Sequence, residues 1–256
     1  MFKNTLIEAI EAAAKILKGH FNGEYGISSK GTINDLVTEV DKKSEKAIID
    51  VISGKYPNHH ILSEEIGEIS GDSGYKWIID PIDGTVNYAH GIPICCISIA
   101  LEKDGEVFMG AVYNPFSDEL FYAQKDFGST LNGKMISVSS NIDIERACLA
   151  TGFPYLWKDV PNNPVEVFIK IIKRGLPVRR LGSAALDLCW LACGRFDGFW
   201  EFNLNPWDSA AGFLIVQEAG GTVTDFSGNK FSPYQNQILA TNGKIHDQML
   251  TAINQI

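Results

Sequence analysis

Apolar residues recur at helical spacing at the beginning of the chain. Six of them share one face of residues 3–18, which predicts an amphipathic helix that ends near Gly19. They are Leu6, Ile7, Ile10, Ala13, Ala14 and Leu17. Residues 23–34 are polar and contain Gly and Ser, so we expect a mobile loop there. A second helix is predicted after Asp41, with Ile48, Ile49 and Ile52 facing inward and Pro57 ending it.

Two short apolar runs that end in acidic residues follow these helices. Residues 61–63 lead to Glu64, and residues 77–79 lead to Asp80. Their β-branched and aromatic composition predicts buried strands. Two strands that deliver acids to one edge of a sheet bring those acids together. The repeated pattern therefore supports a metal site better than either strand does alone.

The rest of the first half is rich in strands. A hairpin is predicted from residues 94–102 and 107–113, with its turn at residues 103–105. Further strands are expected at residues 120–123, 128–131, 136–139 and 147–151. Because the helices are grouped at the start and the strands follow, residues 1–145 are predicted to be an α+β half.

The second half, residues 146–256, alternates between helices and strands. It opens at Pro161 to Pro164, and the pattern predicts an α/β arrangement. The expected helices cover residues 165–174, 182–194, 207–219 and 244–254, and the expected strands cover residues 178–181, 198–202, 222–224 and 238–241. We expect the two halves to form a single domain over residues 1–256.

Composition excludes several functional classes. The formal net charge is −9, and no run of Lys or Arg suggests a nucleic-acid partner. No apolar segment is long enough to span a membrane and no signal peptide is recognisable, so we expect a cytoplasmic protein without a membrane partner. The five cysteines lie in apolar stretches, which argues against disulfides. Cys189 and Cys193 are interpreted as core residues.

The richest chemistry lies in Asp80-Pro81-Ile82-Asp83-Gly84-Thr85. Two carboxylates that converge at the end of a buried strand favour a hard cation such as Mg²⁺. Gly84 and Thr85 resemble the beginning of a helix, whose free N–H groups suit a phosphate. The alternative is an acidic turn in which Asp83 merely caps. For Asp41 and Asp208, the residues alone also allow simple roles as acids at helix beginnings.

Taken together, five segments resemble the inositol monophosphatase family of Mg²⁺-dependent, lithium-sensitive phosphatases. They are Asp35-Leu36-Val37-Thr38 with Asp41, Glu64-Glu65, Asp80-Pro81-Ile82-Asp83-Gly84-Thr85, Gly182-Ser183-Ala184-Ala185 and Trp207-Asp208-Ser209-Ala210-Ala211-Gly212. They occur in order, and the resemblance covers nearly the whole chain. The resemblance implies a layered αβαβα sandwich of mixed α+β and α/β character and, usually, a homodimer.

The resemblance also implies roles for individual residues. The implied ligands of two or three Mg²⁺ ions per active site are Glu64, Asp80, the backbone carbonyl of Ile82, Asp83 and Asp208. The implied catalytic residues are Thr85 and Asp41, which orient and deprotonate the attacking water, and Glu64. The backbone of Asp83, Gly84 and Thr85 would hold the phosphate. The implied contacts to the rest of the substrate are Gly182, Ser183, Ala184, Glu201 and Asp208.

These residues predict a Mg²⁺-dependent phosphomonoesterase that hydrolyses myo-inositol monophosphate through an activated water. The alternatives on the same site are histidinol phosphate and a sugar phosphate such as fructose 1,6-bisphosphate. A regulatory binding protein that retains the fold is an alternative of another class. Glu201 accepts hydrogen bonds only, which suits a polyol ring. It can equally be a solvated acid, or one paired with Arg179 or Arg180.

Overall fold

The computed structural model describes residues 1–29, 36–154 and 163–254. Its larger sheet has eight strands in the order β10-β9-β8-β7-β6-β5-β3-β4. Their bounds are β3 His60–Ser63, β4 Gly67–Ile69, β5 Tyr75–Asp83, β6 Cys96–Lys103, β7 Glu106–Asn114, β8 Glu119–Gln124, β9 Ser129–Leu131 and β10 Lys134–Met135. All neighbours in this sheet are antiparallel except β3 and β5, which are parallel.

The smaller sheet has five strands in the order β12-β11-β13-β15-β14. Their bounds are β11 Leu149–Thr151, β12 Val178–Arg179, β13 Gly198–Phe202, β14 Thr222–Thr224 and β15 Gln237–Thr241. The first three strands are parallel, and β15 runs antiparallel to both β13 and β14. A separate pair, β1 Ile27–Ser29 and β2 Leu36–Thr38, lies before the large sheet in the chain.

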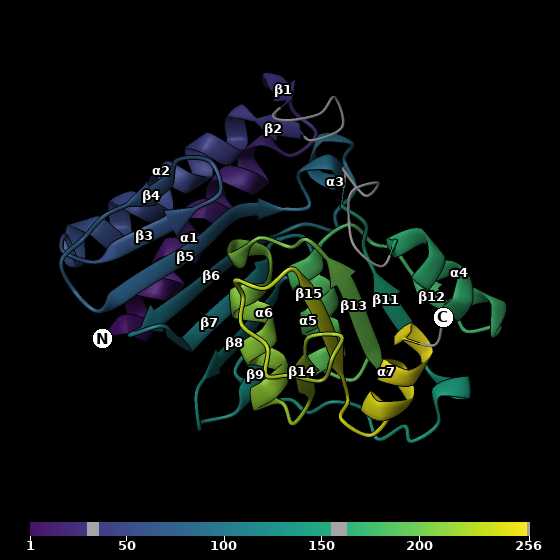
Figure 1. Ribbon diagram of the computed structural model, residues 1–256. Coiled ribbons are helices and arrows are strands. Elements are labelled where there is room, and N and C mark those ends of the chain that lie inside the picture. Colours follow the sequence, from purple (N-terminus) through teal and green to yellow (C-terminus); the bar gives the residue numbers. More distant parts are fainter. Residues whose placement is uncertain (30–35, 155–162, 255–256) are drawn as a thin grey trace.

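Helices cover both sheets and separate them (Figure 1). They are α1 Phe2–His20, α2 Glu39–Lys55, α3 Thr85–Ala89, α4 Pro164–Lys173, α5 Ala184–Ala192, α6 Pro206–Glu218 and α7 His246–Asn254. The pair α1 and α2 packs on the outer face of the large sheet, and α5 and α6 pack between the two sheets. The outer face of the small sheet carries α4 and α7. The five layers confirm the predicted αβαβα sandwich.

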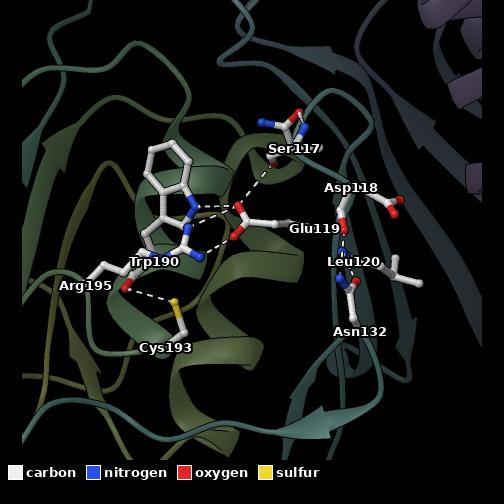
Figure 2. Close-up of polar contacts among 9 residues, drawn as sticks. Ser117, Asp118, Glu119, Leu120, Asn132, Trp190, Cys193 and Arg195 are labelled. Carbon is white, nitrogen blue, oxygen red and sulfur yellow. Dashed lines mark hydrogen bonds and ion pairs between the residues drawn. The ribbon is translucent and has the colours of Figure 1, made fainter.

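The middle layer is held to the large sheet by Glu119 of β8 (Figure 2). Its carboxylate accepts hydrogen bonds from Trp190 Nε1 (3.1 Å), Arg195 Nη1 (3.1 Å) and Ser117 Oγ (3.2 Å), and it forms an ion pair with Arg195. These partners, with burial opposing them, lower the pKa of Glu119, so the acid stays charged. The C-terminal end of α5 is therefore tied to the sheet through a charged contact.

Several sequence predictions need correction. Residues 136–139 do not form a strand, because Ile136 and Val138 pack against the core between the sheets and Val138 N–H donates to Ala219 O (3.1 Å). The strand predicted for residues 178–181 is only Val178–Arg179. Within the loop predicted for residues 23–34, Ile27–Ser29 forms β1. Residues 30–34, Asp35 and Pro161 lie outside the described residues.

All five cysteines are free thiols, as their apolar surroundings predicted. In the described ranges, none of the helices combines the length and the apolar character that a membrane crossing requires. The expected compartment stays a prediction.

Candidate active site

The residues singled out by the sequence meet at one cavity of about 700 Å³. The predicted residues that line it are Glu64, Asp80, Ile82, Asp83, Gly84, Thr85, Gly182, Ser183, Ala184, Glu201 and Asp208. They come from both sheets and from the helical layer between them. Asp41 is fully buried, does not line the cavity and contacts Thr85, which does.

An irregularity in β5 places Asp80 and Asp83 on the same face. Side chains alternate along a strand, so two residues three apart would normally point to opposite faces. Here Asp80 pairs with Ser98 and Asp83 pairs with Cys96, so three steps on β5 match two steps on β6. The register shift is of the kind that a β-bulge produces, and it returns Asp83 to the face of Asp80. The sequence predicted that this strand ends at Asp80, but the strand continues to Asp83.

Glu64 reaches the same place from the neighbouring strand. Because β3 and β5 are parallel, their carboxyl ends lie together, and Glu64 N–H donates to Ile79 O (3.3 Å). Glu45 of α2 fixes this turn by accepting a hydrogen bond from Glu65 N–H (3.0 Å) and another from Ser63 Oγ. Glu45 was not singled out from the sequence, where it looks like an ordinary helix acid.

Asp208 enters from the first turn of α6. Its Oδ2 accepts a hydrogen bond from Asn205 N–H (2.7 Å) in a capping box, so its role as an acid at a helix beginning is confirmed. The same side chain lines the cavity. Asp208 can therefore cap α6 and line the cavity at the same time, since a carboxylate has lone pairs for several partners.

Protein donors hold Asp80 and Asp83 in fixed orientations. Asp83 Oδ2 accepts from Ser183 Oγ (2.7 Å) and Ala185 N–H (2.7 Å), and Asp80 Oδ1 accepts from Ile82 N–H (2.9 Å). Burial, together with the charge of Glu64, nevertheless raises the pKa of Asp83 to about 6. Burial and the neighbouring acids raise the pKa values of Asp80 and Asp208 as well.

This donor set fits a hard divalent cation. Oxygen ligands from carboxylates are those that Mg²⁺ prefers, and buried acids that oppose one another's ionisation are neutralised by such an ion. Within the described ranges, no group of three or more His, Cys, Asp or Glu side chains has an arrangement that could hold a metal ion. The fit therefore rests on the shared cavity and on the chemistry of the four acids, Glu64, Asp80, Asp83 and Asp208.

Thr85 and Asp41 form a hydrogen-bonded pair. Thr85 Oγ1 lies 3.0 Å from Asp41 Oδ1 and 2.9 Å from Ile82 O, and its single proton serves one of these acceptors at a time. Asp41 Oδ2 meanwhile accepts from Thr38 N–H (2.8 Å) in the capping box of α2. The interpretation of Asp41 as a cap is confirmed, and its other oxygen contacts Thr85. Burial raises the pKa of Asp41, which makes it a stronger base.

Only glycine fits at position 84. Its φ is +94°, and a Cβ would lie 2.9 Å from Ile94 O and 3.2 Å from Gly182 O. The chain turns there into α3, as predicted. With five residues, α3 is short, so any phosphate would be held chiefly by individual N–H groups and not by a long helix dipole.

Glu201 of β13 also lines the cavity. It is 8% exposed, and burial followed by the charge of Asp83 raises its pKa to about 8, whereas Arg180 lowers that pKa. No ion pair with Arg179 or Arg180 joins Glu201 within the described residues, so the salt-bridged interpretation is not supported. Gly152 touches this carboxylate, because a Cβ there would lie 2.1 Å from Glu201 Oε1.

Asn87 also lines the cavity, and no role was predicted for it from the sequence. Its Nδ2 donates to Ile94 O and to Leu181 O, both at 2.7 Å, so it joins α3 to the segment that leads into α5. Gly152 was also missed. Its neighbours in sequence carry no acidic residue, and its contact with Glu201 spans 49 positions.

The four acids, Thr85 with its partner Asp41, and Glu201 meet at one cavity and follow the order along the chain that the family pattern implies. A model of the inositol monophosphatase family matches residues 2–256. The chain belongs to the inositol monophosphatase family. It is therefore a phosphoric monoester hydrolase, and dependence on a metal ion is general in this family.

Curated relatives and solved structures of the inositol monophosphatase family agree with this membership. The chain is 43% identical to an inositol-1-monophosphatase of Synechocystis over 249 residues, which cover 96% of this chain and 86% of that protein. It is 40% identical to the Nus factor SuhB of Escherichia coli K12, with 96% and 93% covered. The structure of an inositol monophosphatase from Anabaena matches with a TM-score of 0.89 at 40% identity, covering 100% of this chain and 96% of that one.

The raised pKa of Glu201 predicts how stability depends on pH. A buried acid with a folded-state pKa of about 8 stabilises the fold fully below its unfolded pKa near 4.5, and that contribution is lost as the pH rises through 8. In metal-free buffer at pH 8.5, Glu201→Gln should therefore raise the free energy of unfolding by on the order of 2–4 kcal/mol. At pH 4.5 the variant and the wild type should be nearly equal.

Urea unfolding with EDTA at both pH values measures this difference. The exposed acid Glu11 offers a control, because Glu11→Gln should show no gap at either pH. Equal stability of Glu201→Gln and wild type at pH 8.5 would show that the carboxylate is not destabilised by its surroundings.

Proposed function

We propose that this member of the family hydrolyses myo-inositol monophosphate to inositol and phosphate. The observation that carries the proposal is the place of Glu201. Its buried carboxylate faces the same cavity as the four acids and the Thr85–Asp41 pair, and no described residue donates a hydrogen bond to it. Below pH 8 its protonated carboxyl group donates and accepts hydrogen bonds, and above pH 8 its carboxylate accepts them. Both forms suit a polyol with neighbouring hydroxyls, and the carboxylate also disfavours a second phosphate.

The proposal includes Mg²⁺, in two or three ions per active site. Glu64, Asp80, Asp83, Asp208 and the carbonyl of Ile82 would hold them. When bound, the ions would supply positive charge opposite the phosphate and ease removal of a proton from the attacking water. The Ile82 carbonyl oxygen lies 2.9 Å from Thr85 Oγ1, so this proposed ligand is next to the Thr85–Asp41 pair.

In the proposed reaction, Asp41 and Thr85 move the proton of the attacking water. When Thr85 Oγ1 donates to Asp41 Oδ1, its lone pairs are free to accept from water. As the water oxygen forms its bond to phosphorus, the ester P–O bond to inositol breaks, one water proton passes to Thr85 and the hydroxyl proton of Thr85 passes to Asp41. The departing inositol oxygen takes up a proton from solvent and leaves as a hydroxyl, and Asp41 afterwards returns its proton to solvent. The raised pKa of Asp41 favours this transfer. The N–H groups of Asp83, Gly84 and Thr85 are proposed to hold the phosphate oxygens.

An assay of several phosphate esters tests the proposal. We expect phosphate release from inositol-1-phosphate that requires Mg²⁺, with a higher kcat/KM than for histidinol phosphate or fructose 1,6-bisphosphate. In Glu201→Gln the KM for inositol-1-phosphate should rise ~3–10-fold, because the amide replaces one acceptor with a donor. The KM for p-nitrophenyl phosphate, which has no hydroxyls, should stay unchanged.

A preference for one of the other two esters would contradict the substrate assignment. Failure to release phosphate from any ester with Mg²⁺ would favour the regulatory alternative. The Escherichia coli relative, for example, has the name Nus factor SuhB. The acids in the cavity favour catalysis over that alternative.

A homodimer is the remaining part of the proposal, by resemblance to the family. Ile169 and Ile172 of α4 are exposed apolar residues on the outside of the small sheet and are suited to contacts between subunits. Light scattering should then give twice the 28.2 kDa mass of one chain. A mass of one chain at micromolar concentration would contradict it.

A further inference from the structure

Helix α5 is fixed to the large sheet at both ends. At its beginning, Ser183 Oγ and Ala185 N–H bind Asp83 of β5. At its other end, Trp190 donates to Glu119 of β8 (Figure 2). The side chains between these two anchors therefore have little freedom to shift.

Asp187 lies between the two anchors, and its environment is unusual for an acid. It lines the cavity, yet it is only 1% exposed. Its Oδ1 is buried without a hydrogen-bond partner, and no described residue donates to its other oxygen. Buried carboxyl groups are normally paired, since an unpaired one costs free energy. A group left in this state beside a cavity is suited to partners supplied by a ligand.

Asp187, Glu201 and Arg180 line the same cavity. Among the described residues that line the cavity, Arg180 is the only Arg or Lys, against six acids. Its Nη1 lies 3.7 Å from the position that a Cβ on Gly182 would take. Burial and then the charge of Glu201 raise the pKa of Asp187, and burial and then the charge of Asp83 raise the pKa of Glu201, whereas Arg180 lowers both. One arginine can neutralise one of these two acids, and the other is then favoured in its protonated form.

We propose that Asp187 is a specificity-determining residue which, together with Glu201, forms a two-carboxyl wall that binds the hydroxyl groups of a polyol phosphate. This inference rests on the proposed function and adds a residue that recognises its substrate. A carboxylate accepts hydrogen bonds, and a protonated carboxyl group both donates and accepts. The pair therefore complements neighbouring hydroxyls, which also donate and accept. A second phosphate on the substrate would need further cations to neutralise it, and Arg180 is the only Arg or Lys among the described residues that line the cavity.

Two variants of Asp187 test the wall. Asparagine keeps the shape and one acceptor, and leucine keeps the shape without polar atoms. The KM for inositol-1-phosphate should rise ~3–10-fold in Asp187→Asn and further in Asp187→Leu, with kcat within about twofold of wild type. The KM for p-nitrophenyl phosphate and the Mg²⁺ affinity measured by calorimetry should not change. Thermal stability should be equal or higher, because an unpaired buried acid is removed.

Asp197 provides the matched control. It is also buried, but it accepts from Ser139 Oγ and Cys148 N–H and does not line the cavity. Asp197→Asn should lower the melting temperature and leave both KM values unchanged. That contrast separates recognition of the substrate from a structural role.

Three results would overturn the inference. They are an unchanged KM for inositol-1-phosphate in both variants, an equal rise for both esters, and failure of both variants to fold, which would mean a structural role. A greater loss on histidinol phosphate than on inositol-1-phosphate would show that the wall holds an ammonium and not hydroxyls. If wild type cleaves p-nitrophenyl phosphate but not inositol-1-phosphate, the proposed function itself fails, before any variant is compared.

Discussion

Replacing Asp83 with asparagine should lower Mg²⁺ affinity about a hundredfold and activity by roughly 10²–10³-fold. The reason lies in the fixed orientation of this side chain. Its Oδ2 accepts from Ser183 Oγ and from Ala185 N–H, so the amide oxygen of the variant must take the same position. The amide nitrogen then occupies the other position and faces the cavity. An amide NH₂ has two donors and no lone pair for a cation.

Direct Mg²⁺ titration by calorimetry checks the binding, and phosphate release checks the activity. Ser183→Ala serves as a graded control, because it removes one donor but keeps the carboxylate, and a loss of about tenfold in affinity is expected. Metal-free Asp83→Asn should be no less stable than wild type at pH 8. The stabilising contribution of Asp83, whose pKa is about 6, is present at low pH and lost as the pH rises through 6. Wild-type Mg²⁺ affinity in Asp83→Asn would remove Asp83 from the proposed ligands.

Thr85→Ala should lower kcat ~10²–10³-fold and leave Mg²⁺ affinity nearly unchanged. Asp41→Asn should cause a similar loss for a specific reason. The oxygen that accepts from Thr38 N–H must remain an oxygen to preserve the cap, so the new NH₂ group faces Thr85 Oγ1. It donates where the carboxylate accepted, and the proton of Thr85 has no acceptor on residue 41. The double variant should be no slower than either single variant.

Stopped phosphate-release assays at saturating Mg²⁺ measure these effects. Thr85→Ser keeps the hydroxyl and should retain most of the activity. Asp41→Ala loses the cap as well and should cost about 1 kcal/mol of stability, whereas Asp41→Asn should not. Losses that multiply in the double variant would show that Thr85 and Asp41 act independently, and the proton path proposed for them would then be wrong.

Much of the fold follows from local patterns. The amphipathic face of α1, the apolar runs of β3 and β5, and the helix beginnings at Thr85 and Asp208 depend on residues within a few positions of each other. Side-chain periodicity and capping act over that range, so the pattern predicts the elements directly. Residues 136–139 show the limit. Their alternation is typical of a strand, but packing against the core between the sheets decided their conformation.

In the candidate site, too, local sequence predicts some features and the tertiary structure decides others. The acids, the Gly84 turn and the Thr85 hydroxyl could be picked from the sequence, because each stands at the end of a locally defined element and their order resembles a known family. The sequence also supplied both interpretations of Asp41 and Asp208, as caps and as site residues. The structure shows that each makes its cap while facing the site.

What the sequence determined by itself is which residue types stand at strand ends and helix beginnings, and from them the fold class, the family and the reaction class. Only the tertiary structure decided how those residues are oriented. Asp83 shares a face with Asp80 because β5 shifts register against β6, and donors at positions 183 and 185 fix its carboxylate across about a hundred residues. The tertiary structure also brings Glu201 against Gly152 and leaves Asp187 without a donor among the described residues. Such contacts join segments that are distant in the chain, and no local periodicity encodes them.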